Sequence, residues 1–261
     1  MRCNFQRRKV FQTAKAATFA KAQTERDHRT PRSCVLEWKD MADAKFSGVR
    51  ALIFDLDGTL IDSKRDLIHS VNAMLRELKR PQLAADTISG YIGHGAPQLV
   101  ARAMGGTATE EELKHALQFF LGYYEEHKMD NTFAYPGVAD TLERLAHLPM
   151  GVLTNKPARI SVRILKALGL QKYFRAIYGG NSFESKKPDP FGAATILQEF
   201  GVAPQEGMIV GDSEVDVQTA RNAGMFAAAV NYGFGVHDRD AYPADIYLDR
   251  FADLAEFLDH A

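Results

Sequence analysis

Residues 49–63 read VRALIFDLDGTLIDS, and this stretch decides both the fold and the chemistry that we expect. The apolar run 49–56 predicts a short buried strand whose end carries two carboxylates, Asp55 and Asp57. In an open parallel sheet, ligands bind at the C-terminal ends of the strands. Two carboxylates held close together repel each other, which favours a bound divalent cation or a raised pKa on one of them. Gly58 then permits a tight exit from the strand.

Two other interpretations apply to this acidic pattern when it is taken by itself. One is a strand followed by an acidic turn that holds no ligand. The other is part of a calcium-binding loop, which needs further oxygen ligands and a closing Glu about twelve residues from its start. Asp66 stands in that region instead, and a predicted strand rather than a helix precedes the motif, so the calcium loop is disfavoured.

Further apolar runs follow downstream, and helical patterns separate them. The runs lie at 150–154, 176–179, 207–211, 226–230 and 245–248. Strands that alternate with helices predict βαβ units and a mostly parallel sheet, and therefore an α/β fold. The interval 63–134 departs from this pattern, because it contains no convincing strand. Its segments with helical apolar spacing are 66–79, 86–104 and 110–129.

Composition excludes several classes of protein. The chain has 261 residues, 46% of them hydrophobic and 25% charged, with a formal net charge of -1, as in an ordinary globular protein. Balanced charge provides no field that would attract nucleic acid. The sequence has no uncharged apolar run of about 18 residues, so we expect neither a transmembrane helix nor a membrane partner. Two cysteines exclude a disulfide-rich secreted scaffold.

The first 48 residues differ from the rest of the chain. Both cysteines lie here, and residues 1–24 carry six basic side chains and no acidic one. Three interpretations stay open: an organelle transit peptide, a disordered basic arm, or a translation start at Met41. No cysteine occurs after Cys34, which fits a reducing compartment, and we expect a cytoplasmic protein.

Two more motifs stand where predicted helices begin. Thr154 and Asn155 follow a predicted strand, and a hydroxyl with backbone N–H groups at a helix N-terminus suits a phosphate. Helix capping alone would also explain these two residues. Lys187 lies in Lys186-Lys187-Pro188 and offers a point charge that neutralises phosphate, unless this segment is only a solvated basic turn.

The last motif is acidic and again follows an apolar strand. Asp212 directly follows the run 207–211, at a position from which it can reach a cation held by Asp55. Asp216 lies one helical turn further on the same face. Helix capping and the helix dipole explain either residue singly. They do not explain why so many predicted strand ends carry such chemistry.

In this order, the four motifs resemble the haloacid dehalogenase-type superfamily of phosphatases, over about residue 49 to the C-terminus. The resemblance implies a Rossmann-like core with an all-helical cap inserted after the first strand. We therefore expect a core of 49–62 and 135–261, a cap of 63–134, and a separate extension of 1–48.

The resemblance also implies a role for each acidic residue. Asp55 would attack phosphorus and form an aspartyl-phosphate. Asp57 would protonate the leaving group and then deprotonate the hydrolytic water. Mg²⁺ would be held by Asp55, Asp212 and the backbone carbonyl of Asp57. Asp216 would orient a lysine of the site or the waters on the metal.

The phosphoryl group has its own implied partners. Thr154, the Asn155 N–H and Lys187 would hold its oxygens, and Lys187 would also offset developing charge. Lys187 is preferred to Lys186 because the family lysine directly precedes the proline.

Differences from related families narrow the range of reactions that the protein could catalyse. Asp57 argues against dehalogenases and phosphonate-cleaving relatives, which lack this second acid. Leu67 stands where related mutases carry a cap histidine. The turn Gly93-His94-Gly95 resembles one in phosphoglycolate phosphatases and would close over the substrate. The alternatives are that the two glycines only separate two helices and that His94 is a surface residue.

These observations predict a Mg²⁺-dependent phosphatase for a small phosphorylated metabolite, with 2-phosphoglycolate as the leading substrate. Lys64, Arg65 and Arg102 are the candidates for pairing with its carboxylate. The alternatives are a sugar phosphate (including N-acetylmuramate 6-phosphate), a nucleotide or pyrophosphate, or a non-catalytic phosphate-binding relative. We expect a monomer or a homodimer.

Overall fold

The computed structural model describes residues 46–235 and 238–258. The expectations for the basic leader therefore fall almost entirely outside the described residues. Within the described part of the chain, no helix is both long and apolar enough to cross a membrane.

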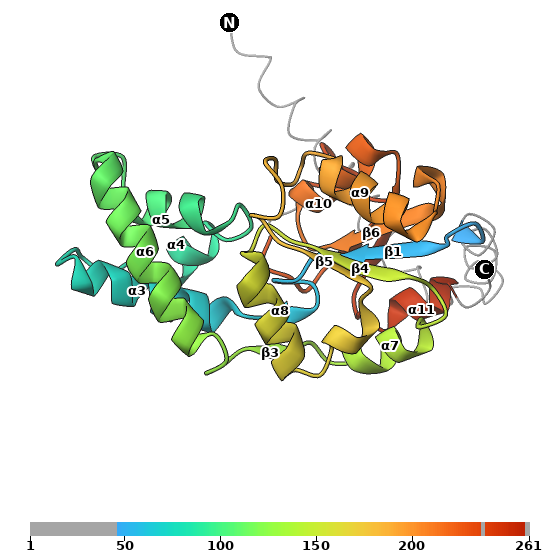
Figure 1. Cartoon of the computed structure of the whole chain (residues 1–261), viewed down its shortest axis with the longest axis horizontal. Helices are drawn as coiled ribbons and strands as arrows, with labels where there is room; N and C mark the ends of the chain where they lie inside the picture. Colours follow the sequence, from blue (N-terminus) through green and yellow to red (C-terminus); the bar gives the residue numbers. More distant parts are fainter. Residues whose placement is uncertain (1–45, 236–237, 259–261) are drawn as a thin grey trace, which may run out of the picture. The chain divides into compact units, whose positions relative to one another are not determined.

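A six-stranded parallel sheet forms the centre of the fold (Figure 1). Its strands, in spatial order, are β5 (Ala176–Tyr178), β4 (Met150–Leu153), β1 (Ala51–Phe54), β6 (Gly207–Gly211), β7 (Phe226–Val230) and β8 (Ile246–Leu248). In the central strand β1, Leu52 pairs with Met150 on one side and Met208 on the other. All four β1 residues are fully buried, as expected for a strand covered on both faces. The predicted α/β fold with a parallel sheet is confirmed.

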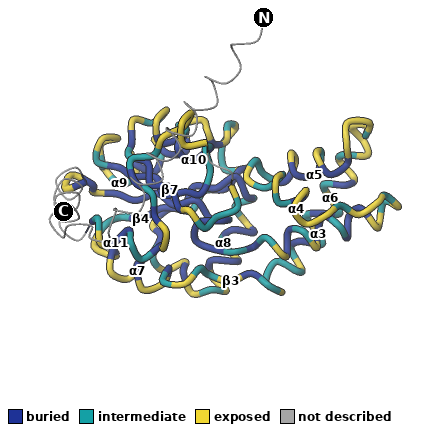
Figure 2. Tube along the Cα trace, turned by 180° about the vertical axis from the view of Figure 1, so that it is seen from behind, coloured by how far each residue is buried: buried dark blue, intermediate teal, exposed yellow. Residues whose placement is uncertain are grey.

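Helices cover both faces of this sheet (Figure 1). Helices α9 (Phe191–Phe200) and α10 (Glu214–Ala223) lie on one face, and α7 (Val138–Arg144), α8 (Ala158–Ala167) and α11 (Asp253–Leu258) lie on the other. The apolar side chains of β1, α9 and α10 form one buried cluster that includes Ile53, Ile196 and Val217. Figure 2 shows the strands β4 and β7 as buried. The sheet is thus covered on both faces, and the loops at its carboxyl edge carry the predicted motifs.

Four helices form the insert that follows β1. They are α3 (Lys64–Glu77), α4 (Ala85–Ser89), α5 (Ala96–Met104) and α6 (Glu110–His127). The sequence pattern joined 86–104 into one segment, but the structure divides it, because Gly93 and Gly95 adopt positive φ angles of 110° and 86° that end helical geometry. Helix α6 begins at a capping box in which Thr109 and Glu112 exchange hydrogen bonds.

Two short strands connect the insert to the sheet. β2 (Ile61–Asp62) and β3 (Phe133–Ala134) pair antiparallel. This pair was not predicted, because two residues are too few to show a periodicity. Asp66, buried in the first turn of α3, fastens the same connection. Its carboxylate accepts hydrogen bonds from the backbone N–H groups of Asn131 and Thr132 at 3.0 and 2.9 Å, and from their side chains at 2.8 and 2.7 Å.

Candidate active site

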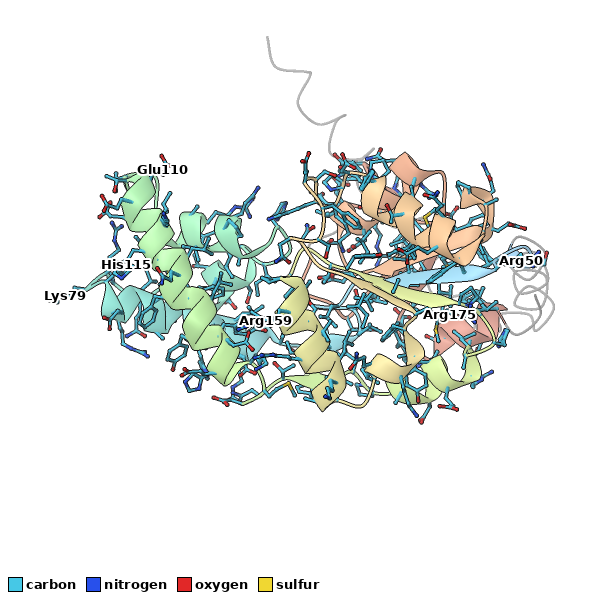
Figure 3. All side chains as sticks on the ribbon, in the orientation of Figure 1. Arg50, Lys79, Glu110, His115, Arg159 and Arg175 are labelled. Carbon is cyan, nitrogen blue, oxygen red and sulfur yellow. The ribbon has the colours of Figure 1, made fainter. Side chains whose placement is uncertain are left out.

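The predicted motifs meet at the carboxyl ends of three neighbouring strands. β4, β1 and β6 are adjacent in the sheet, so Thr154, Asp55 and Asp212 follow strands that lie side by side. Arg50, labelled in Figure 3, marks the opposite end of β1, away from the insert. From β1, the chain adds β4 and β5 on one side of the sheet and then β6, β7 and β8 on the other, so the strand order reverses beside β1. This is the topological switch point at which open α/β sheets bind ligands.

A buried cluster of acidic groups lies at this edge. Asp55, Asp212 and Asp216 each place a carboxylate oxygen within 4.8 Å of the others. The Lys187 ammonium lies 2.8 Å from Asp55 Oδ1 and 2.6 Å from Asp216 Oδ1. Asp216 also accepts hydrogen bonds from the Ser213 backbone and hydroxyl, which complete a helix cap. Asp216 thus contacts both Lys187 and the first turn of α10, whereas Asp55 contacts Lys187 through Oδ1.

Burial changes the acidity of two of these groups. It raises the pKa of Asp55 from 3.8 to about 6; the positive charge of Lys187 opposes this rise and the Asp216 charge adds to it. Burial, together with the charges of Asp216 and Asp55, raises the pKa of Asp212 from 3.8 to about 7. The Lys187 ammonium pairs with two of the three carboxylates in this buried site. Such an all-oxygen, electron-rich set fits a hard divalent cation such as Mg²⁺.

The backbone around Asp212 is shaped to hold its carboxylate. Asp212 Oδ2 accepts hydrogen bonds from the N–H groups of Phe234 at 2.7 Å and Gly235 at 2.9 Å. Gly58 approaches from the other side with φ of 83°, and a Cβ atom there would lie 2.2 Å from Asp212 Oδ2. The conformation and the contact both require glycine at position 58.

Asp57 lies apart from this cluster and has its own partners. Its two carboxylate oxygens lie 2.9 and 3.0 Å from the Lys156 ammonium, and it also accepts a hydrogen bond from the Ser63 hydroxyl. The same ammonium donates to the Tyr124 hydroxyl and lies 4.5 Å from the centroid of that ring. Sequence reasoning assigned no role to Lys156 or Tyr124. Lys156 stands inside the Thr154–Pro157 motif, but nothing in the sequence indicates that α6 brings Tyr124 to it.

Lys156 is charged although it is buried. Burial lowers its pKa, but the negative charge of Asp57 and the contact with Tyr124 outweigh this and raise the pKa above its ordinary value. Burial raises the pKa of Tyr124 to about 12, against the effect of Lys156, so its hydroxyl stays protonated near neutral pH. The group is therefore an ammonium between a carboxylate and a neutral phenol.

The predicted phosphate-binding residues are buried beside Asp55. Thr154 and Asn155 line the same cavity as Asp55 and Asp57. The Asn155 side chain donates to the Gly93 carbonyl at 3.0 Å and to the Lys187 carbonyl at 3.3 Å, so it joins the insert turn to the lysine loop.

The insert turn completes the cavity. Gly93 and Gly95 line it, whereas the adjacent His94 is not among its lining residues. A Cβ atom on Gly95 would lie 2.9 Å from the Asn155 carbonyl oxygen, so glycine permits this close approach. None of the proposed carboxylate partners, Lys64, Arg65 and Arg102, lines the cavity.

A second set of contacts joins α6 to α8. Glu125 pairs with Arg163 and, at 3.6 Å, with Arg159, which Figure 3 shows between these two helices. Partial burial opposes the effect, but the hydrogen bond from Arg163 and the charges of Lys128 and the two arginines hold the pKa of Glu125 below its usual range. Glu125 and Tyr124 thus fasten the insert to the sheet domain at adjacent positions.

Comparisons with known proteins agree with this geometry. The family described as haloacid dehalogenase-like hydrolase matches residues 52–230. A phosphoglycolate phosphatase of Chromobacterium violaceum is 38% identical over 216 residues, which cover 80% of this chain and 96% of the relative. Phosphoglycolate phosphatase 1 of Pseudomonas aeruginosa is 38% identical over 223 residues, which cover 81% of this chain and 80% of the relative.

Solved structures show the same fold. A crystal structure from Haemophilus somnus, titled a predicted phosphoglycolate phosphatase, has a TM-score of 0.76 and 32% identity, covering 80% of this chain and 97% of that one. A haloacid dehalogenase-like family protein from Streptococcus pneumoniae has a TM-score of 0.71 and 26% identity, covering 80% of this chain and 98% of that one. The sequence motifs, the geometry of the site and these matches agree: the chain belongs to the haloacid dehalogenase-like hydrolase family.

Proposed function

We propose that this protein is a Mg²⁺-dependent phosphatase that hydrolyses a small phosphate monoester through an aspartyl-phosphate, and that its substrate is 2-phosphoglycolate. One observation carries the proposal. Asp55 lies in a buried acidic cluster beside Lys187, while a second carboxylate, Asp57, is held separately two residues away. The separation provides a nucleophile and an acid/base in different surroundings. Similar proteins that are named phosphoglycolate phosphatases support 2-phosphoglycolate as the substrate.

Each residue then has a task. Asp55 attacks phosphorus, and Asp57 delivers a proton to the leaving oxygen and takes one from the water that hydrolyses the intermediate. Asp55, Asp212 and the Asp57 backbone carbonyl would hold Mg²⁺. When bound, the ion supplies positive charge that offsets the repulsion between carboxylate and phosphate.

The phosphoryl oxygens are held by Thr154, the Asn155 N–H and Lys187. Lys187 offsets the charge that develops on them. Asp216 fixes the position of Lys187 through their 2.6 Å contact. This pre-positioning means that the ammonium does not have to reorganise during the reaction.

We further propose that residues 63–134 act as a cap over a core of 49–62 and 135–261. The Gly93-His94-Gly95 turn would exclude water from the site and contact the leaving group. The hydrogen bond from Asn155 to Gly93 supports this role, because it joins the turn to the phosphate-binding loop.

A substrate screen tests the proposal. Purified protein with Mg²⁺ is assayed for phosphate release from 2-phosphoglycolate, N-acetylmuramate 6-phosphate, hexose phosphates, nucleotides, pyrophosphate and p-nitrophenyl phosphate. We expect the highest kcat/KM for 2-phosphoglycolate, loss of activity with EDTA and recovery with Mg²⁺. A rate for 2-phosphoglycolate no better than for the aryl phosphate would reject the substrate, and EDTA-resistant turnover would reject the metal.

A further inference from the structure

The cavity above Asp57 has one positive charge. Among the described residues that line it, Lys156 is the only cation. The wall that the insert contributes is largely apolar. It includes Leu67, Ile92, Leu99, Phe120 and Leu121.

Lys156 is held in the site rather than solvated. Its side chain is 3% exposed, and its ammonium lies between Asp57 and the Tyr124 hydroxyl. A charge in such a position is costly unless it is paired. An ammonium has three hydrogens to donate. Two of its contacts go to the same carboxylate, so one can be exchanged for a ligand oxygen while Asp57 keeps the other.

A leaving group must lie in this cavity. Asp55, Asp57 and Thr154 line it together, so atoms beyond the ester oxygen extend toward the insert wall. There, most of the wall is formed by leucine, isoleucine and phenylalanine side chains, so the several hydroxyl groups of a sugar would find few hydrogen-bond partners, which is unfavourable. An anionic group near Asp57 would meet the positive charge of Lys156.

We propose that Lys156, positioned by Tyr124, is the receptor for a carboxylate carried by the leaving group. The inference rests on the proposed phosphatase function and deepens it: the preferred substrate is a phosphate monoester with a carboxylate one carbon from the ester oxygen. Lys156 then sets specificity, and Lys64, Arg65 and Arg102 do not.

The test compares two substrates that differ in this one group. 2-Phosphoglycolate and ethyl phosphate have the same carbon chain, but only the first carries a carboxylate. A hydrogen bond to a charged group is worth about 1.5–3 kcal/mol, so wild-type protein should favour 2-phosphoglycolate about 10- to 100-fold in kcat/KM. Lys156→Met should bring this ratio close to one, Tyr124→Phe should lower it partly, and Lys156→Arg should restore part of it.

Arg65→Met is the matched control, because it removes an exposed cation that does not line the cavity, and its ratio should equal that of wild type. If Lys156 only positions Asp57, Lys156→Met will slow both substrates equally and keep the ratio, which overturns the inference alone. If the variant is too slow to assay, binding of the two esters is compared in Asp55→Asn with and without Lys156→Met. Equal loss of affinity for both esters again overturns the inference, and loss confined to 2-phosphoglycolate supports it. A wild-type protein that hydrolyses neither ester overturns the proposed function itself.

Discussion

Asp66 fastens the two connections of the helical insert, and its replacement should strongly destabilise the protein. The buried carboxylate accepts four hydrogen bonds, all from Asn131 and Thr132. In Asp66→Ala, these donors lose their acceptor inside the protein. One hydrogen bond to a charged group contributes about 1.5–3 kcal/mol, but four bonds to one group are not additive, and losses above about 4–5 kcal/mol are exceptional. We therefore expect the free energy of unfolding to fall by about 3–4 kcal/mol.

Thermal and urea denaturation measure this loss. At about 2–4 °C per kcal/mol for a domain of this size, Tm should fall by about 10 °C. Asp66→Asn should destabilise less, because its amide oxygen can still accept the three hydrogen bonds made to Oδ2, while its NH₂ faces the Asn131 side-chain NH₂. Asp86→Ala is the control, since it removes an exposed first-turn acid of α4 and should cost less than about 1 kcal/mol. An Asp66→Ala protein as stable as the control would contradict the role of Asp66 as the acceptor that holds this connection.

Three further predictions follow from the site. Gly58→Ala should abolish phosphatase activity and weaken Mg²⁺ binding measured by calorimetry, because its Cβ would lie 2.2 Å from Asp212 Oδ2; retention of wild-type affinity would contradict this. Burial raises the pKa of Asp55 to about 6 and of Asp212 to about 7, above the value of 3.8 taken for the unfolded chain. In EDTA, the buried carboxyl groups therefore stabilise the fold fully only while they are protonated, below about pH 4. The protein should lose this stability as these groups ionise on raising the pH to about 7, and bound Mg²⁺ should restore it. Melting curves at pH 5 and pH 8 check this sign, with Asp212→Asn as the variant that should flatten the slope. Glu125→Gln should raise KM a few-fold, because it weakens the contacts between α6 and Arg163 of α8. Stability should change little, since the site is partly exposed. An unchanged KM in steady-state kinetics would contradict this prediction.

The strands and their polar ends were predictable from the sequence, for physical reasons. A fully buried parallel strand such as Ala51–Phe54 must be almost entirely apolar, so it is visible as a run of such residues. The polar residue that ends the run then marks the carboxyl edge of the sheet, which is how Asp55, Thr154 and Asp212 could be placed together.

Contacts between distant segments were not predictable in this way. Tyr124 meets Lys156 because α6 lies against the loop that follows β4. Helical spacing in the sequence does not indicate which helix packs on which loop. Asp66 appeared only as a residue that fails to close a calcium loop, yet it accepts four hydrogen bonds from a segment 65 and 66 residues away. The candidates for carboxylate recognition were chosen by charge, and burial instead favours Lys156.

The central claim is that Asp55 becomes covalently phosphorylated during turnover, and chemical trapping tests it most directly. The protein is quenched in acid during hydrolysis of 2-phosphoglycolate and treated with borohydride, which reduces an acyl phosphate to an alcohol. Peptide mass spectrometry should then find homoserine in place of aspartate at position 55, and should find none in Asp55→Asn or without substrate. Full turnover by Asp55→Asn, or trapping at another carboxylate, would contradict the mechanism.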